Sequence, residues 1–280
     1  MIPADFDYVA PGSLDEALQA LAEGGEDAKA LAGGHSLLPL MKVRLAVPTL
    51  LVDLRKLTDL RGVAQADGGV RIGALTRHAD LQERTDLGPI GTAAKKIADQ
   101  QVRNRGTIGG SLAHGDPASD LPAVMLAAEA TISAHGGDGE RTIPAADLFV
   151  DYLETSLEPG ELITAIDVPD LSAWGWGYEK FNRRAEDWAM VGVCAMVRKG
   201  ADASCEDVRI GLTHMGSTAL RATAAEEALR GQPLDGERIA RAAEQAAEGT
   251  DPPADLNATA EYKRHLARVL TRRALEAAAA

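Results

Sequence analysis

The spacing of apolar residues divides the chain into three regions, and the first region alternates helical and strand patterns. Ser13 and Glu16 form a capping box, after which Leu14, Leu18 and Leu21 recur at helical spacing. Short apolar runs on either side of the next helical pattern predict strands. The expected elements are a helix over 13–21, a strand over 29–32, a helix over 37–45 capped by Ser36, and a strand over 49–54.

The second region mixes helices with alternating strands. Apolar alternation is clearest over 161–168, and the turn Gly136 to Gly139 joins two short strands as a hairpin. The expected elements are a strand over 69–74, a helix capped by Thr76 that runs to Glu83, a helix over 89–102, a loop over 107–120, a helix over 121–128, hairpin strands over 130–134 and 141–143, and a strand over 161–168.

The third region places its strands before its helices, which is typical of an α+β domain. Three strand patterns joined by short loops predict an antiparallel meander. The expected strands cover 178–184, 190–198 and 208–215, and the expected helices cover 223–230, 235–248 and 259–277. We therefore expect an α+β chain with three domains, over 1–55, 56–170 and 171–280.

Two adjacent glycine pairs differ from the others in their sequence context. Gly33-Gly34 and Gly109-Gly110 each precede hydroxyl or imidazole residues and then a helical pattern. Paired glycines let the backbone approach a ligand and expose its N–H groups, so each segment is a candidate half of a phosphate cradle. An isolated glycine pair is more often an ordinary turn. No Gly-x-Gly-x-x-Gly comes after either strand of the first region, which argues against a Rossmann domain.

The charge balance excludes several classes of partner. Among 280 residues the net charge is −13, which argues against binding to nucleic acid or to an anionic membrane surface. No apolar run is long enough to span a bilayer, and the N-terminus lacks a signal-peptide pattern. We therefore expect a cytoplasmic protein, free or held at the inner face of the membrane through its partners. Cys194 and Cys205 are too few to hold an iron–sulfur cluster, and the scattered histidines do not suggest zinc.

The segment from Tyr178 to Trp188 concentrates charges and aromatic rings at the end of a strand. It is consistent either with a salt-bridged rim or with a wall over a flat ring system, with Trp188 or Tyr178 near the ring. Lys29 alone would be an ordinary solvated lysine, and His35 and His114 alone would be ordinary surface or core histidines. Sequence proximity of Ser36 or Ser111 to a histidine is weak evidence for a hydrolytic triad.

Both glycine segments together resemble the FAD pyrophosphate motifs of the flavoprotein medium subunit of molybdenum hydroxylases. The resemblance rests on Ala32-Gly-Gly-His-Ser-Leu-Leu-Pro39 and on the segment from Thr107 to Asp120, with support from Arg183 to Trp188 and from Glu161 to Ile163. The medium subunit of aerobic carbon monoxide dehydrogenase is the nearest type, and the xanthine dehydrogenase FAD domain is more distant. Ser111 stands where a related motif often has Asn, and the position of His114 varies in the wider family.

The resemblance implies two N-terminal FAD-binding subdomains of the vanillyl-alcohol-oxidase-like type and a C-terminal antiparallel sheet with helices. The backbones of 32–36 and 107–111 would hold the pyrophosphate, Ser119 and Asp120 the ribityl or phosphate region, and Leu162 and Ile163 the adenine or dimethylbenzene side. Ala98 and Lys180 fall near the flavin. The implied FAD-binding residues are Lys29, Ala32, Gly33, Gly34, His35, Ser36, Leu37, Ala98, Thr107, Gly109, Gly110, Ser111, His114, Ser119, Asp120, Leu162, Ile163 and Lys180.

The same resemblance implies an oxidoreductase subunit that relays electrons. A large molybdopterin-binding subunit would oxidise the substrate, and a small 2Fe-2S subunit would pass electrons to FAD on this chain. FAD would then reduce a quinone, NAD or oxygen, within a dimer of heterotrimers. The alternative is a free-standing FAD-binding oxidoreductase without a molybdenum partner.

Overall fold

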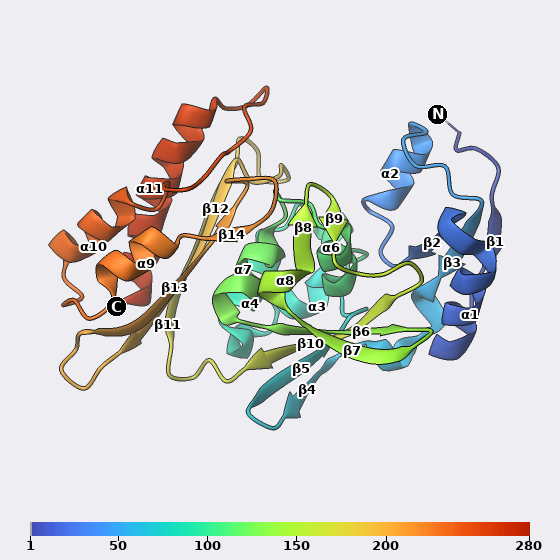
Figure 1. Cartoon of the computed structure of the whole chain (residues 1–280), viewed down its shortest axis with the longest axis horizontal. Helices are drawn as coiled ribbons and strands as arrows, with labels where there is room; N and C mark the ends of the chain where they lie inside the picture. The colour runs from blue at the N-terminus through green and yellow to red at the C-terminus, as the bar shows by residue number, and fades with distance from the viewer. Residues whose placement is uncertain (1) are drawn as a thin grey trace.

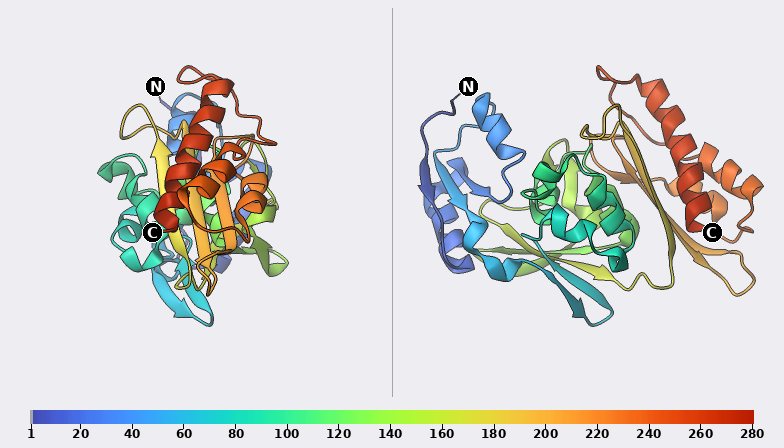
Figure 2. Two further views of the ribbon diagram at one scale, coloured as in Figure 1. Left: turned by 90° about the vertical axis from the view of Figure 1, so that its left-hand side faces the viewer. Right: turned by 180° about the vertical axis from the view of Figure 1, so that it is seen from behind.

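Three β-sheets succeed one another along the molecule, each with its own helices (Figure 1). The computed structural model describes residues 2–280. The N-terminal and C-terminal regions lie at opposite ends, and the middle region separates them, as Figure 1 and the right-hand view of Figure 2 show. Within residues 2–280, no helix combines the length and apolar character needed to cross a membrane.

The first sheet is parallel and has the order β1-β3-β2. Its strands are β1 (Asp7–Val9), β2 (Ala28–Leu31) and β3 (Leu50–Asp53), and its helices are α1 (Leu14–Gly24) and α2 (Leu37–Lys42). Ser13 Oγ accepts from the Glu16 N–H, as the capping box predicts. Ser36 makes no side-chain cap, and α2 ends three residues early because Arg44 adopts a left-handed conformation with φ 59°.

The second sheet is antiparallel, with the order β4-β5-β10-β6-β7. Its strands are β4 (Val63–Ala66), β5 (Gly69–Gly73), β6 (Thr131–Gly136), β7 (Gly139–Pro144) and β10 (Leu162–Pro169), and a small hairpin pairs β8 (Phe149–Asp151) with β9 (Glu154–Thr155). Its helices are α3 (His78–Gln82), α4 (Pro89–Lys95), α5 (Gln100–Arg103), α6 (Ile108–His114), α7 (Asp120–Ala128) and α8 (Ala145–Leu148). The predicted hairpin and the strand over 161–168 are confirmed.

The third sheet is the predicted antiparallel meander, β11-β12-β13, with a short fourth strand, β14. Its elements are β11 (Gly175–Phe181), β12 (Val191–Lys199), β13 (Cys205–Thr213), β14 (Leu220–Arg221), α9 (Thr223–Leu229), α10 (Gly236–Glu244) and α11 (Ala260–Ala278). The helix α11 packs on β11 and β12, and α7 packs on β12 and β13 (Figure 1). The helix α7 is buried on all sides, and it therefore joins the second and third sheets. Both cysteines are buried, with Cys194 in the core as its apolar surroundings predict.

Three expectations for the second region are wrong, each because a polar or left-handed residue redirects the chain. The helix expected over 89–102 is broken into α4 and α5, since Ala98 has φ 41° and Asp99 caps a new helix. Thr76 does not cap α3; its hydroxyl donates to backbone carbonyls, including that of Gly73 at 2.6 Å. The segment expected as a loop over 107–120 instead forms α6, with Thr107 as its N-cap.

The approach of α7 to the third sheet depends on a residue without a side chain. A Cβ at Gly211 would lie 2.0 Å from the carbonyl oxygen of Ala123, on the backbone of α7. We expect Gly211→Ala to lower the free energy of unfolding by about 1–3 kcal/mol, because neither backbone can yield without repacking. Urea unfolding of the FAD-saturated protein measures this loss. Gly236→Ala is the matched control, since its Cβ would meet open space; an equal loss there would contradict the packing argument.

Candidate functional site

A cavity of about 530 Å³ lies where the first two sheets meet, and its wall reaches the third sheet at Lys180. Every residue that the sequence singled out for binding lines this cavity, although these residues come from both glycine segments, from the turn before α5, from α7 and from the strands β2, β10 and β11. They are Lys29, Ala32, Gly33, Gly34, His35, Ser36, Leu37, Ala98, Thr107, Gly109, Gly110, Ser111, His114, Ser119, Asp120, Leu162, Ile163 and Lys180. The direct contact of each one with a cofactor stays a prediction.

The turn between β2 and α2 presents free backbone N–H groups to the cavity. Among the hydrogen bonds of residues 2–280, none is donated by the consecutive N–H groups from Gly33 to Leu37. Gly34 has φ 78°, in the left-handed region, and turns with such a residue bring successive N–H groups together into a concavity. Such a concavity binds an anion, so this turn fits a phosphate group.

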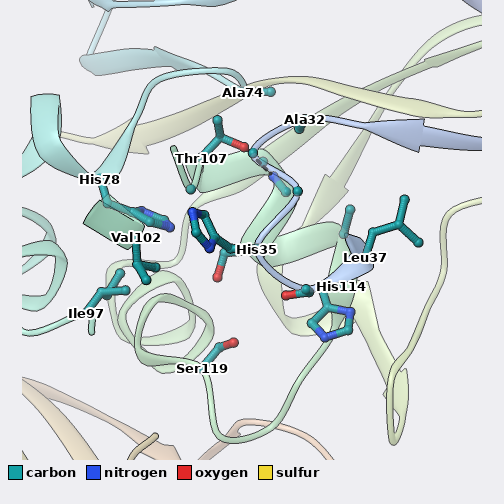
Figure 3. A pocket seen from close by; sticks show the side chains of 18 of the residues that line it. Ala32, His35, Leu37, Ala74, His78, Ile97, Val102, Thr107, His114 and Ser119 are labelled. Carbon is teal, nitrogen blue, oxygen red and sulfur yellow. Dashed lines mark hydrogen bonds between the residues drawn. The ribbon is translucent and has the colours of Figure 1, made fainter. Parts of the chain in front are cut away.

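Close packing against neighbouring backbone explains why both segments need glycine. A Cβ at Gly33 would lie 2.5 Å from the carbonyl oxygen of Arg105, and a Cβ at Gly109 would lie 2.6 Å from the Cβ of Ala74. A Cβ at Gly110 would lie 2.8 Å from Thr107 Oγ1, and the Cβ of Ala32, which Figure 3 shows near Thr107, would be at an ordinary contact distance of 3.6 Å. The glycines therefore form the closely packed floor of the cavity.

The second glycine segment differs from the expected open cradle, because its N–H groups are already used within the protein. The N–H of Ile108 donates to Thr76 O at 3.0 Å, and that of Gly109 donates to Ala74 O at 2.8 Å. The N–H of Gly110 donates to Thr107 Oγ1, and that of Ser111 to Thr107 O. The free N–H groups of the cradle therefore come from the first segment, and the second supplies hydroxyl groups and a close surface.

A strained turn forms another part of the wall. Ala98 lies in the left-handed region, which is unfavourable for a residue with a Cβ. The guanidinium of Arg103 stabilises this turn, since its Nη1 donates to Ile97 O at 2.7 Å and to Ala98 O at 2.8 Å. Ile97, Ala98 and Val102 together give the cavity an apolar wall at this point.

Two imidazole rings lie beside each other in the cavity wall, His35 from the first segment and His78 from α3 (Figure 3). Burial lowers the pKa of His78 to about 4, with a further contribution from the charge of Arg103, so this ring is neutral at physiological pH. Burial also lowers the pKa of His35. Among residues 2–280, His78 Nδ1 is buried and has no hydrogen-bond partner. Neutral rings add no positive charge beside the free N–H groups, which remain available to an anion.

A buried ion pair between Lys180 and Asp120 forms another part of the cavity wall. Lys180 Nζ donates to Asp120 Oδ2 at 2.9 Å, and the hydroxyl of Tyr178 donates to Asp120 Oδ1 at 2.5 Å. Burial raises the pKa of Asp120, and the Lys180 charge and the two hydrogen bonds oppose this rise. Both carboxylate oxygens accept hydrogen bonds, and one donor is an ammonium group, so these contacts favour the ionised form of Asp120. Ser119 precedes α7 without a side-chain cap, and Asp120 is used by Lys180 and Tyr178 rather than as a cap.

The two aromatic candidates of the charged segment separate in the structure. Trp188 lines the cavity together with Glu186 and Asp187, and its side chain is 56% exposed. Tyr178 is buried behind the wall, where it contacts Asp120. Of the two alternatives, Trp188 therefore lies where a ring could contact a ligand in the cavity, and its contact with a ligand stays a prediction.

His78, Trp188 and the apolar side chains around Ala98 extend the site beyond the predicted residues. A sequence signal existed for Trp188, in the charged aromatic segment, but not for His78, which begins a short helix far from both glycine pairs. Within residues 2–280, no three His, Cys, Asp or Glu side chains are placed to hold a metal ion together.

The geometry of the site suits a cofactor that combines anionic phosphate groups with apolar rings. A flavin dinucleotide has both. Residues 4–171 match the family described as the FAD binding domain in molybdopterin dehydrogenase, and residues 176–278 match the CO dehydrogenase flavoprotein C-terminal domain. The chain belongs to this family of FAD-binding dehydrogenase subunits, and it is an oxidoreductase that carries FAD.

Relatives and solved structures agree with this assignment over the full length. The carbon monoxide dehydrogenase medium chain of Hydrogenophaga pseudoflava is 43% identical, covering 99% of this chain and 98% of the relative. The 6-hydroxypseudooxynicotine dehydrogenase complex subunit alpha of Paenarthrobacter nicotinovorans is 41% identical, covering 98% and 95%. The solved carbon monoxide dehydrogenase from Hydrogenophaga pseudoflava superposes with a TM-score of 0.95 at 44% identity, covering 99% of this chain and 98% of that one.

Proposed function

We propose that this chain is the flavin-carrying electron-transfer subunit of a molybdenum hydroxylase. The observation that carries the proposal is full-length similarity to a medium chain and to a complex subunit, both of dehydrogenases. In the proposed complex, a large molybdopterin-binding subunit oxidises the substrate and a small 2Fe-2S subunit passes the electrons to FAD. FAD then reduces an external acceptor, which is a quinone, NAD or oxygen. The named substrates of the two relatives differ, so the substrate belongs to the partner's site.

The cavity supports a specific placement of FAD. The free N–H groups from Gly33 to Leu37 would bind the pyrophosphate, with the close surface of Thr107 to Ser111 beside it. Leu162 and Ile163 offer apolar contact for one end of the cofactor, and Ala98 and Lys180 offer the wall for the other. Bound FAD supplies the redox chemistry, and the protein binds it, orients it and sets its electrostatic surroundings.

The proposal also includes the architecture of the assembly. We propose domains over 1–55, 56–170 and 171–280, a division supported by the three sheets, whose strands fall within these ranges. The assembly is a dimer of heterotrimers in the cytoplasm, free or held at the inner face of the membrane through partners. This chain contributes only the flavin step, so partners must supply the rest.

Purification of the native protein without denaturants tests the relay. We expect flavin absorbance together with iron–sulfur absorbance, molybdenum in equimolar amount, and three chains that co-purify. The isolated chain, reloaded with FAD, is expected to show little substrate-dependent dye reduction, because it lacks the oxidising centre. Flavin without metals or further chains in the native protein, or strong substrate turnover by the isolated chain, would contradict the relay and favour a free-standing flavoprotein.

A further inference from the structure

Tyr178 lies outside the cavity, but its hydroxyl contacts Asp120, a charged residue of the cavity wall. Its ring is buried, and its hydroxyl donates to Asp120 Oδ1 at 2.5 Å. The other carboxylate oxygen accepts from Lys180 Nζ at 2.9 Å. Asp120 and Lys180 both line the cavity, whereas Tyr178 does not. The hydroxyl therefore reaches a cofactor only by way of Asp120.

Further hydrogen bonds fix the strand that carries both Tyr178 and Lys180. Lys96, at the end of α4, donates from Nζ to Tyr178 O at 3.0 Å. Lys180 Nζ donates in return to Lys96 O at 3.0 Å. The Lys96 ammonium also lies 5.4 Å from the centre of the Tyr178 ring, which suits a cation–π contact. These bonds join α4, α7 and β11 and leave the Tyr178 ring little freedom to turn away.

The charges of this cluster set the balance that the cavity experiences. Asp120 carries the only negative charge among Lys96, Asp120, Tyr178 and Lys180, against the two ammonium groups. The remaining titratable groups near it are Cys194, which faces the same region from β12, and Glu186 and Asp187 at the cavity wall. Protonation of Asp120 would therefore make this wall more positive by one charge, since it would leave both ammonium groups without this carboxylate.

We propose that Tyr178 is a positioning residue of the flavin site, whose hydroxyl keeps the Asp120 carboxylate charged and directed at Lys180. The inference rests on the proposed placement of FAD in this cavity. Reduction adds electrons to the flavin ring, so a more positive wall favours the reduced form. By holding Asp120 charged, Tyr178 keeps the reduction potential of FAD low and insensitive to protonation of this carboxylate.

The test is a double-mutant cycle on the FAD-loaded full chain, with Tyr178→Phe, Asp120→Asn and the double variant. We expect the FAD reduction potential of Tyr178→Phe to match that of the wild type at alkaline pH. It should rise relative to the wild type as the pH falls, because burial raises the pKa of Asp120 and one opposing hydrogen bond is gone. The expected shift is about tenfold in the ratio of oxidised to reduced flavin, or about 30 mV for a two-electron couple.

The double-mutant cycle shows whether Tyr178 affects the FAD reduction potential through Asp120. Asp120→Asn is expected to raise the potential at every pH, and adding Tyr178→Phe to it should change nothing further, because the hydroxyl then has no carboxylate to hold. A potential of Tyr178→Phe that equals that of the wild type at every pH overturns the inference. So does an equal shift by Tyr178→Phe in both backgrounds. Tyr152→Phe, which removes an exposed hydroxyl outside this cluster, is the control.

Loss of FAD from the variants would also test the role of Tyr178. If Tyr178→Phe loses FAD while the double variant retains it, the hydroxyl acts through Asp120 and the inference holds. If both lose FAD, the ring has a wider structural role and the inference is overturned. The placement of FAD is tested separately, since it fails if substitution at Gly33 leaves binding intact, whatever the result of the cycle.

Discussion

Gly33→Ala is expected to reduce FAD binding about tenfold, so that the purified variant carries less flavin than the wild type. The added Cβ would lie 2.5 Å from the carbonyl oxygen of Arg105 and 2.7 Å from the Cα of Gly106. Both are backbone atoms, so the two glycine segments must move apart, at a cost of about 1–3 kcal/mol. A cost of about 1.4 kcal/mol corresponds to a tenfold change in affinity. Flavin released by acid, measured per chain, gives the occupancy, and titration of the stripped protein gives the affinity.

Gly137→Ala is the matched control, because a Cβ there would meet nothing within 4 Å and the residue lies in a hairpin away from the cavity. We expect this variant to bind FAD like the wild type. Full flavin occupancy in Gly33→Ala would show that the cradle lies elsewhere. An equal loss in both variants would point to general instability rather than to the contact between the two segments.

Lys180→Met is expected to weaken the folded state by about 3–5 kcal/mol at neutral and alkaline pH. The substitution preserves the length of the side chain but leaves Asp120, which is 4% exposed, without its ionic partner. FAD binding should weaken as well, since Lys180 lines the cavity. Urea unfolding of the cofactor-free protein separates the loss of stability from the loss of binding.

The pH dependence of Lys180→Met distinguishes a lost ion pair from lost packing. Without Lys180, burial raises the pKa of Asp120 in the folded protein further above its unfolded value. A raised carboxyl pKa means that folding takes up a proton, so the stability deficit is small in acid and grows as pH rises from the unfolded pKa to the folded pKa. A deficit that is constant with pH would contradict the electrostatic explanation. Lys56→Met, at an exposed lysine, should have little effect at any pH.

The sequence predicts the fold where a local pattern and the tertiary environment agree. Short apolar segments bounded by turn residues identify β10, the β6–β7 hairpin and the meander of β11 to β13. The failures occur where a single residue overrides the pattern. Ala98 breaks an otherwise continuous helical pattern, and only the contacts of Arg103 with the turn explain why this conformation is stable.

The sequence also predicts the part of the site that carries a local signal, and it misses the part that depends on tertiary contacts. Glycine pairs that precede hydroxyl residues carry a local signal, and the resemblance to a family brought both segments together. Which N–H groups are free could not be predicted, because the answer depends on Ala74 and Thr76, which accept hydrogen bonds from Gly109 and Ile108. His78 had no signal at all, since only the fold brings it beside His35 (Figure 3).

The cavity draws its walls from strands of all three sheets, including Lys29 from the first, Ile163 from the second and Lys180 from the third. A ligand that contacts all three is linked thermodynamically to their association. At a free concentration about one hundred times its dissociation constant, such a ligand adds about 2.7 kcal/mol to the free energy of unfolding. The resistance of this chain to proteolysis therefore depends on flavin supply, and riboflavin starvation should shorten its lifetime in the cell before any change in its synthesis.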